Sequence, residues 1–483
     1  MELIYDDLKS IQEVRCLIKK AKEAQKIYCE LGQEKIDHIV KKVAEAGEKN
    51  AEKLAKLAVE ETGFGNYEDK IIKNKFASRV VYESIKDLKT IGIIKEDMEK
   101  KVIEIGTPVG VIAGLIPSTN PTSTAIYKSL IALKAGNAII FSPHPNAKNS
   151  IIEAVKILSE AAINAGAPEG IIGCMTIPTM EGTDELMKNN DVSLILATGG
   201  SAMVKAAYSS GTPAIGVGPG NGPAFIEKSA DITMAVKRIV DSKTFDNGVI
   251  CASEQSIVVE KCIKENVINE LIGQGCYFLN EEETEKVSKF ILRANGTMNP
   301  QIVGKTAKDI ANMAGITIPN GTKILISEQE KVGKNYPFSR EKLAPILAFY
   351  TEEDWEKACE KCIKLLNNEG IGHTLIIHSN NEDVIREFAL KKPVSRILVN
   401  TPGALGGIGG TTNLIPALTL GCGAVGGSAT SDNVNPLNLM NIRRLAYGIR
   451  ELEDLKPKKE NSLEINDELI YSITKLVIEK LNC

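Results

Sequence analysis

The sequence lacks the features that mark membrane, secreted and nucleic-acid-binding proteins. No apolar run in its 483 residues approaches the roughly 20 residues that span a bilayer. The start, MELIYDDLKS, is acidic and polar, so it is not a secretory signal. The net charge of -4 gives no basic surface for nucleic acid. We therefore expect a cytoplasmic protein without a membrane or nucleic-acid partner.

Histidines and paired cysteines are also scarce, which argues against a metal centre. Only four histidines are present, too few for a histidine-rich metal centre; they are His38, His144, His373 and His378. The ten cysteines are scattered, and in a large chain without a signal they are expected to be free thiols. Cys359 and Cys362 form a CxxC pair, a spacing found in zinc and redox sites. Because the pair lies in the helical pattern DWEKACEKCIKLL, without a second CxxC, we expect no metal site.

The chain is too long for one core, so two or three domains are expected. The first 90 residues have apolar positions at helical spacing, with a stop at Gly63. From Gly110 onward, short apolar runs such as GVIAGLIP, NAIIFSP and VSLILATGG alternate with helical stretches, and the pattern restarts after Ser229. This alternation predicts an α/β fold with two doubly wound parallel sheets, which bind ligands beyond the carboxyl ends of their strands.

Two segments differ from this pattern. Residues 89–106, KTIGIIKEDMEKKVIEIG, predict two short strands around a charged turn, and the edges of such a ribbon can pair with another subunit. Near the end, the charged stretch EDLKPKKENSLEIND is typical of a linker, and it leads into an amphipathic helix that Asn466 or Asp467 would cap. The apolar stripe of this helix must be buried against its own enzyme, a neighbouring subunit or another protein; it consists of Leu469, Ile473, Leu476, Val477 and Leu481.

The segment FDNGVICASEQ, residues 245–255, is the most informative one for function. Cys251 follows a glycine turn between a predicted helix and strand, where a thiol has the partial exposure that nucleophilic cysteines need. A lone cysteine is more often a small core residue. Here the context favours the nucleophile, because the segment resembles the nucleophile segment of the aldehyde dehydrogenase superfamily, with Phe245, Asn247 and Gly248 in matching places.

The resemblance covers nearly the whole chain up to about Gly448 and is closest to the CoA-acylating branch, which includes the N-terminal half of the bifunctional aldehyde–alcohol dehydrogenases. The motifs that carry it are EETGFGNYEDK, IPSTNPTSTAIYKSL, FSPHPNAK, GVGPGNGP, REKLAPIL, EGIGHT and TLGCG. It implies a homodimer or homotetramer built through the ribbon. The implied parts are an NAD-binding domain of residues 1–87 and 108–227, a catalytic domain of 228–433, an oligomerisation arm of 88–107 with about 434–450, and a linker with a C-terminal helix in 451–483.

The resemblance implies that Cys251 attacks the aldehyde carbonyl, and that hydride transfer to NAD then leaves a thioester. Asn120, in the STNP turn, resembles the oxyanion-hole asparagine, although an asparagine before Pro121 also has a simple turn-forming role. Glu341, in REKLAP, resembles the glutamate that hydrogen-bonds the nicotinamide ribose. His373, in EGIGHT, is a candidate proton acceptor for the CoA thiol or Cys251, and a structural histidine at a strand end is the alternative.

The residues predicted to contact the cofactor follow the predicted strands. Gly199 and Gly200 end a buried strand and open a helix, whose amides suit a pyrophosphate. Hydrolytic relatives carry a lysine for the adenosine ribose at the position of Ser142, so its loss fits a site that the adenine ends of NAD and CoA share in turn. The preference for NAD over NADP is implied by the family alone. The other candidates are Pro117, Ser118 and Thr119 for the nicotinamide half, with Pro143 and His144 beside Ser142.

Val217 is the departure that separates thiolysis from hydrolysis. Hydrolytic relatives carry a glutamate that activates water for deacylation, and alignment on Pro223 places Val217 at that position and Asn221 at a following lysine. Without a general base, water attacks the thioester slowly, so the acyl group passes to CoA. We therefore expect an acylating enzyme for a short aldehyde, acetaldehyde or propionaldehyde. A hydrolytic enzyme that gives a free acid is the less favoured alternative.

The sequence leaves the substrate and the location open. Stretches such as AAYSSGTPAIGVGPGN resemble the acylating succinate-semialdehyde enzymes equally well. That substrate needs a cation for its far carboxylate, for which Arg396, Arg443 and Lys70 are candidates. The C-terminal helix is similar to helices that direct relatives into bacterial microcompartments, where it would contact the shell or another enzyme.

Overall fold

A five-stranded parallel sheet lies at the centre of the first half of the chain in the computed structural model, which describes residues 4–457 and 466–482. Its order is β5-β4-β3-β6-β7. The order reverses between β3 and β6, and ligands in doubly wound sheets bind at such a reversal. The strands are β3 (Val111–Ile116), β4 (Ala138–Pro143), β5 (Ile172–Cys174), β6 (Leu194–Thr198) and β7 (Ala214–Val217).

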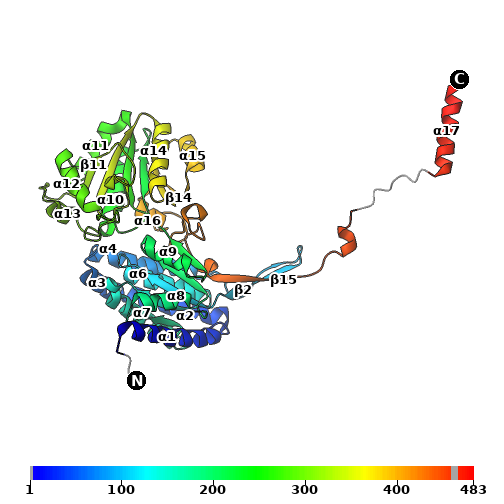
Figure 1. The fold of residues 1–483 in the computed structure, drawn as a ribbon, viewed down its shortest axis with the longest axis horizontal. Helices are drawn as coiled ribbons and strands as arrows, with labels where there is room; N and C mark the ends of the chain where they lie inside the picture. Colours follow the sequence, from blue (N-terminus) through cyan, green and yellow to red (C-terminus); the bar gives the residue numbers. More distant parts are fainter. Residues whose placement is uncertain (1–3, 458–465, 483) are drawn as a thin grey trace.

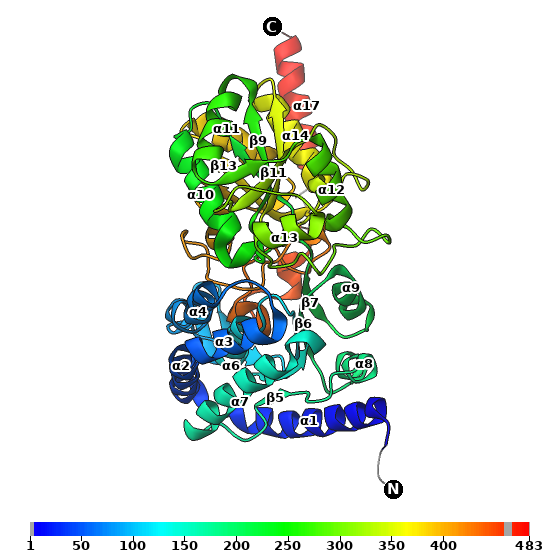
Figure 2. The same cartoon turned by 90° about the vertical axis from the view of Figure 1, so that its left-hand side faces the viewer.

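Helices cover both faces of this sheet (Figure 2). Helix α3 ends at Gly63, whose φ of +64° is the left-handed conformation that glycine adopts most readily, as the sequence predicts. Every residue of α6 is buried, because this helix packs against α2 and α7 as well as the sheet. The helices are α1 (Asp6–Tyr28), α2 (Gly32–Lys49), α3 (Ala51–Thr62), α4 (Tyr67–Lys75), α5 (Val81–Ile85), α6 (Pro121–Lys134), α7 (Lys148–Asn164), α8 (Met180–Lys188) and α9 (Ser201–Ser209).

A seven-stranded parallel sheet organises the second half, in the order β10-β11-β12-β9-β8-β13-β14. Its strands are β8 (Gly222–Ile226), β9 (Glu254–Glu260), β10 (Cys276–Phe278), β11 (Ile324–Glu328), β12 (Ile346–Glu352), β13 (Gly372–His378) and β14 (Val394–Val399). The accompanying helices are α10 (Ile232–Thr244), α11 (Lys264–Gly273), α12 (Glu281–Ile291), α13 (Ala307–Ala314), α14 (Trp355–Asn368), α15 (Glu382–Lys391) and α16 (Gly403–Gly407). Cys359 and Cys362 are buried on α14, in the helix predicted for them.

The predicted boundary between the two halves, at residues 227 and 228, is wrong by a whole strand. Strand β8 pairs in parallel with both β9 and β13, so it lies inside the second sheet. The second sheet therefore begins at Gly222. Neither β8 nor β10 is predicted from the sequence.

The two halves lie one above the other in both views (Figures 1 and 2), and the nucleophile segment contacts both of them. Phe245, Ile250 and Ala252 belong to the same hydrophobic core as the first sheet, and Cys251 packs against that core. Strand β9, which begins three residues later, belongs to the second sheet. The segment before β9 is therefore held by both halves.

A three-stranded antiparallel ribbon extends away from both halves (Figure 1). Strand β1 (Gly92–Asp97) pairs with β2 (Val102–Pro108), and β2 pairs along its length with β15 (Met440–Ala446). The pairing places residues 440–446 in the arm predicted for 88–107.

The tail ends in helix α17 (Asp467–Leu481), which lies apart from both halves (Figure 1). The side chain of Asn466 accepts a hydrogen bond from the Leu469 amide, so Asn466 is the N-cap. Every residue of the helix is exposed, including the predicted apolar stripe. The predicted linker overlaps residues 458–465, which lie outside the described residues. No helix within residues 4–457 or 466–482 is long and apolar enough to cross a membrane.

The exposure of α17 predicts that the tail adds little to the stability of the body. A chain that ends at Leu455 should unfold within about 2 °C of the full chain, because removing exposed side chains forfeits little buried apolar area. Differential scanning fluorimetry of the two proteins measures this. A fall of more than about 5 °C would mean that the helix packs on its own enzyme in solution.

Candidate active site

The turn before Cys251 has an unusual backbone. Asp246, Asn247 and Gly248 have φ values of 48°, 54° and 76°, so three consecutive residues are left-handed. Non-glycine residues adopt this conformation at a cost of about 1 kcal/mol each. Cys251 follows three residues later and is half-buried. Its carbonyl oxygen lies so close to Gly220 that a Cβ there would be 1.8 Å from it, so the 218–221 loop touches the nucleophile segment.

The surroundings of Cys251 do not favour its thiolate. Loss of water, with smaller contributions from Glu341 and Cys422, raises the pKa of the thiol to about 12. The cation Arg396 lowers this pKa. Cys251 is therefore a neutral thiol at pH 7 in the protein without its ligands, unlike cysteines that are permanently ionised.

Asn120 is joined to this turn through a single lysine. It is the N-cap residue of α6, and it follows Pro117, Ser118 and Thr119, which are partly exposed beyond the end of β3. The Lys73 ammonium donates to Asn120 Oδ1 and also to Asp246 Oδ2. Asn120 Nδ2 donates to Thr119 Oγ1 at 3.3 Å.

We use the word junction for the group formed by Lys70, Lys73, Asn120, Asp246, Cys251 and Glu341. Sequence reasoning does not identify the roles of three of these residues. Lys73 and Asp246 are not predicted to act at all, and Lys70 is considered only for a substrate carboxylate. Lys70 instead donates to Asp246 Oδ2 at 3.0 Å and to the Thr119 carbonyl at 3.2 Å. A usable signal was the spacing of Lys70, the last residue of the EETGFGNYEDK motif, and Lys73, which places two cations on one face of a helix.

Glu341 contacts the same 218–221 loop. Its Oε1 accepts a hydrogen bond from the Gly220 amide at 2.8 Å, and its own amide donates to Glu369 Oε2 at 2.8 Å. Burial and the charge of Glu369 raise the pKa of Glu341 to about 8. The shared neighbour Gly220 brings Glu341 and Cys251 to the same place.

Gly199 and Gly200 lie between β6 and α9, at the predicted carboxyl edge of the first sheet. Gly200 is exposed, and nothing lies within 4 Å of the space where its Cβ would be. The amides at the start of α9 are therefore open to an anion. Val217 ends β7 opposite Thr198 of β6, and it is 4% exposed.

Residues 142–144 lie at the same carboxyl edge of the first sheet, but two of their three side chains are buried. Ser142 is buried near the end of β4, and its hydroxyl shares a 2.8 Å hydrogen bond with the Thr183 hydroxyl. Pro143 is buried as well, whereas His144 is exposed, and its Nδ1 accepts from the Asn146 amide. Of the three residues, only His144 presents a side chain to solvent.

His373 is fully buried at the start of β13. Its Nδ1 shares a 2.8 Å hydrogen bond with the Thr374 hydroxyl, and its Nε2 has no protein partner among the described residues. Burial and Arg396 lower the pKa of His373 to about 3, so the ring is neutral at physiological pH. A neutral ring is able to accept a proton, but no hydrogen bond within the described residues joins it to Cys251.

Arg396 binds the backbone around the site. Its guanidinium donates to the carbonyls of His373 at 3.0 Å and Ser431 at 3.2 Å, to the Gly421 carbonyl, and to Asn433 Oδ1 at 2.7 Å. All these acceptors are neutral. Arg443 lies on β15, in the arm.

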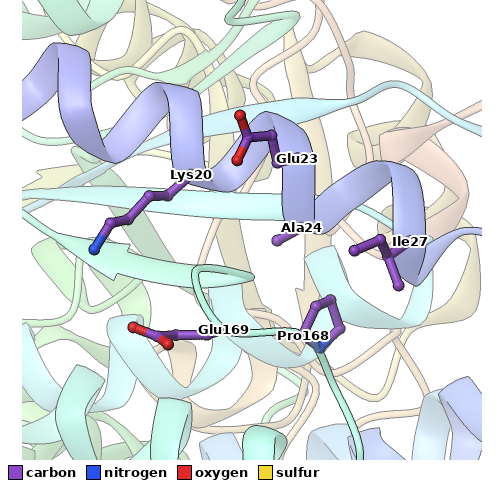
Figure 3. Close-up of a pocket in the computed structure, with 6 residues that line it drawn as sticks. All are labelled: Lys20, Glu23, Ala24, Ile27, Pro168 and Glu169. Atoms are coloured by element: carbon purple, nitrogen blue, oxygen red, sulfur yellow. The ribbon is translucent and has the colours of Figure 1, made fainter.

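Two surface cavities lie away from this junction. One, of about 310 Å³, lies between α1 and the loop before β5 and is lined by Lys20, Glu23, Ala24, Ile27, Pro168 and Glu169 (Figure 3). The other, of about 550 Å³, is at the base of the arm. No group of three metal-ligating side chains gathers within residues 4–457 and 466–482. The candidate site is therefore defined by the junction residues.

Comparison with known proteins places the chain in a family. The aldehyde dehydrogenase family model matches residues 7–411, and the chain belongs to that family. It is 48% identical to the bifunctional aldehyde-alcohol dehydrogenase AdhE of Escherichia coli over 442 residues, which are 90% of this chain and 50% of that protein. The chain thus spans about half the length of that relative.

Solved structures include similar proteins of comparable length. An acetylating aldehyde dehydrogenase from Geobacillus thermoglucosidasius is 56% identical, with a TM-score of 0.92 over 95% of this chain and all of that one. A propionaldehyde dehydrogenase from the fucose utilisation bacterial microcompartment of Clostridium phytofermentans is 30% identical, with a TM-score of 0.82 over 90% of this chain and 97% of that one.

The raised pKa of Cys251 predicts a steep pH dependence of its alkylation. Below its pKa the thiol is protonated, so the rate of reaction with iodoacetamide should rise about tenfold per pH unit between pH 7 and 9. Mass spectrometry of the peptide that contains Cys251 follows the rate, and Cys251→Ser serves as the blank. A plateau below pH 8 would show that the thiol already ionises in the free protein.

Proposed function

We propose that this chain is an NAD-dependent CoA-acylating aldehyde dehydrogenase. It would convert a short aldehyde, CoA and NAD into an acyl-CoA, NADH and a proton, and the reverse. The observation that carries this proposal is that Cys251 and Glu341 share the neighbour Gly220, while Lys73 links Asn120 to the turn before Cys251. By alignment, Val217 would occupy the position at which hydrolytic relatives carry their base.

The residues at the junction suit a nucleophilic mechanism. The Cys251 sulfur attacks the aldehyde carbon, and its proton leaves to a base, for which the neutral imidazole of His373 is the candidate. The Asn120 Nδ2 and the Cys251 amide donate to the oxygen that becomes negative. Loss of hydride leaves the acyl group on Cys251 as a thioester. The CoA sulfur then takes the acyl group and frees the Cys251 thiol.

The carboxyl edge of the first sheet suits a dinucleotide. Gly200 leaves open space at the start of α9, where a pyrophosphate would accept from backbone amides. Residues 117–119 would contact the nicotinamide half, and Glu341 its ribose. NAD, when bound, accepts the hydride. The exposed ring of His144 would lie toward the adenosine, whereas Ser142 would support the strand end through Thr183.

Val217 favours CoA over water as the acyl acceptor. It is an apolar side chain, 4% exposed, so it offers no base to a water molecule. Glu341 is mostly protonated near pH 7 because its pKa is raised to about 8, it already accepts from the Gly220 amide, and it has a proposed role at the ribose. A thioester on Cys251 would therefore persist until a thiol nucleophile attacks it.

The positions of three cations favour a short uncharged aldehyde. Succinate semialdehyde needs a cation for its second carboxylate. Lys70 is paired with Asp246, Arg396 is bound to backbone carbonyls, and Arg443 lies in the arm. We therefore propose acetaldehyde or propionaldehyde as the substrate.

NADH formation tests the proposed function. Acetaldehyde and propionaldehyde should give NADH only when CoA is present, succinate semialdehyde should react more slowly, and Cys251→Ala should be inactive. The product with CoA should be the acyl-CoA. Equal turnover without CoA, giving the free acid, would overturn the acylating assignment. Val217→Glu is a matched variant, in which CoA-independent turnover should rise, because a carboxylate there can activate water.

We also propose that α17 docks onto the inner surface of a bacterial microcompartment and that the arm joins subunits. The helix presents its apolar stripe to solvent on a capped, separate element, and a similar solved enzyme comes from such a compartment. The arm exposes Ile93, Ile442 and Leu445 on strands with open edges, which suits pairing in a homodimer or homotetramer.

Removal of α17 should separate location from catalysis. In cells that form shells, a chain that ends at Leu455 should no longer sediment with them, while its CoA-dependent turnover in solution stays unchanged. Ile473→Asp with Leu476→Asp is a subtler variant that keeps the length but breaks the stripe. Unchanged sedimentation of both variants would exclude the helix as the docking element.

A further inference from the structure

Two lysines of α4 lie buried beside the turn that precedes Cys251. Lys70 and Lys73 are each 2% exposed, and Asp246 is fully buried. Both ammonium groups donate to the same oxygen, Asp246 Oδ2. The Asp69 carboxylate lies beside this group and adds a second negative charge, and each ammonium completes its hydrogen bonds with a further acceptor. These acceptors lie in the segment before α6: the Thr119 carbonyl for Lys70, and Asn120 Oδ1 for Lys73.

The position of Asp246 is fixed from several sides. Its Oδ1 accepts from the Asn66 amide at 2.8 Å, and its own amide donates to Asp69 Oδ2 at 2.7 Å. A Cβ on Gly65 would lie 1.8 Å from Asp246 Oδ1, so only glycine permits this approach. The left-handed backbone at Asp246 is thus maintained by contacts with the start of α4.

The contact between Lys73 and Asn120 determines the orientation of the Asn120 side-chain amide. An ammonium only donates hydrogen bonds, so it binds the amide oxygen and not the amide nitrogen. With Oδ1 held by Lys73, the Nδ2 group is the end of the side chain that remains to donate elsewhere. A cation on the oxygen also draws electron density from the amide and strengthens the Nδ2 donors.

We propose that Lys73 is a positioning residue for oxyanion stabilisation, which orients and polarises the Asn120 amide while its pairing with Asp246 ties that amide to the turn of the nucleophile. The inference rests on the proposed function, because it presumes that Asn120 donates to the oxyanion. Lys73 itself touches neither substrate nor cofactor. Its effect on the rate passes entirely through Asn120.

Lys134 provides a matched control at the other end of α6. It is fully buried and pairs with Asp37 at 2.5 Å, and it donates to the Lys86 carbonyl at 2.6 Å. Lys134→Met therefore removes the same kind of buried ammonium without touching Asn120. Both lysine variants should lose stability, but only Lys73→Met should lose turnover.

A double-mutant cycle tests the proposal with acetaldehyde, CoA and NAD. Asn120→Ala should lower kcat about 100-fold, as is typical for loss of one oxyanion donor. Lys73→Met should lower kcat at least about tenfold, with the KM values for NAD and CoA within about twofold of wild type. The variant with both changes should be no slower than Asn120→Ala, because Lys73 has nothing to position once the amide is gone.

The outcomes separate this inference from the proposed function. A wild-type protein without CoA-dependent turnover would overturn the function itself. With an active wild type, losses that multiply in the double variant, an unaffected Lys73→Met, or an unaffected Asn120→Ala would overturn the role of Lys73 alone. Lys134→Met should combine with Asn120→Ala without any further loss of kcat. If Lys73→Met does not fold, Lys73→Gln, which still donates to Asp246 but carries no charge, takes its place in the cycle with the same expected result.

Discussion

The buried carboxylate of Asp246 is the contact on which the candidate site depends. It is reached by two lysines and one amide of the α4 region, and it lies in the turn that leads to Cys251. Without it, the left-handed turn would lack its partners, and the 117–120 segment would lack its link to the second half. Each sheet satisfies its own backbone, whereas the nucleophile segment is held between the two by these ionic contacts.

The same burial has opposite effects on different groups at the junction. It raises the pKa values of Cys251 and Glu341 and lowers that of His373, so all three are mostly neutral near pH 7. The site therefore carries little standing negative charge before ligands enter. In the proposed reaction the neutral imidazole of His373 can accept the proton of Cys251, and the charge that forms during attack meets the dipoles of amides. Fixed dipoles stabilise such transient charge without a free-energy cost of reorganisation at the moment of reaction.

The sequence predicts most strands of the two sheets because their apolar runs are continuous, and it predicts the capped helix at Asn466. It does not predict β8, a five-residue strand whose place between β9 and β13 depends on partners far along the chain. The same limit applies to the site. Cys251 and Asn120 are identified from their motifs, but Lys73 and Asp246 are 173 residues apart and meet only in the folded chain. The hydrogen bond that turns Ser142 toward Thr183 is likewise invisible in the motif that contains Ser142.

The raised pKa of Cys251 and the buried apolar side chain of Val217 both bear on the choice between CoA and water in the proposed reaction. In the proposed reaction, the burial of Cys251 makes the free thiol a weak nucleophile, and this costs rate at the first step. The same environment deprives water of a base and of solvation as it approaches the thioester. CoA is less affected, because its binding energy away from the sulfur can bring the thiol to the acyl group. The proposed enzyme would therefore attack the aldehyde more slowly, but it would transfer the acyl group selectively to CoA and not to water.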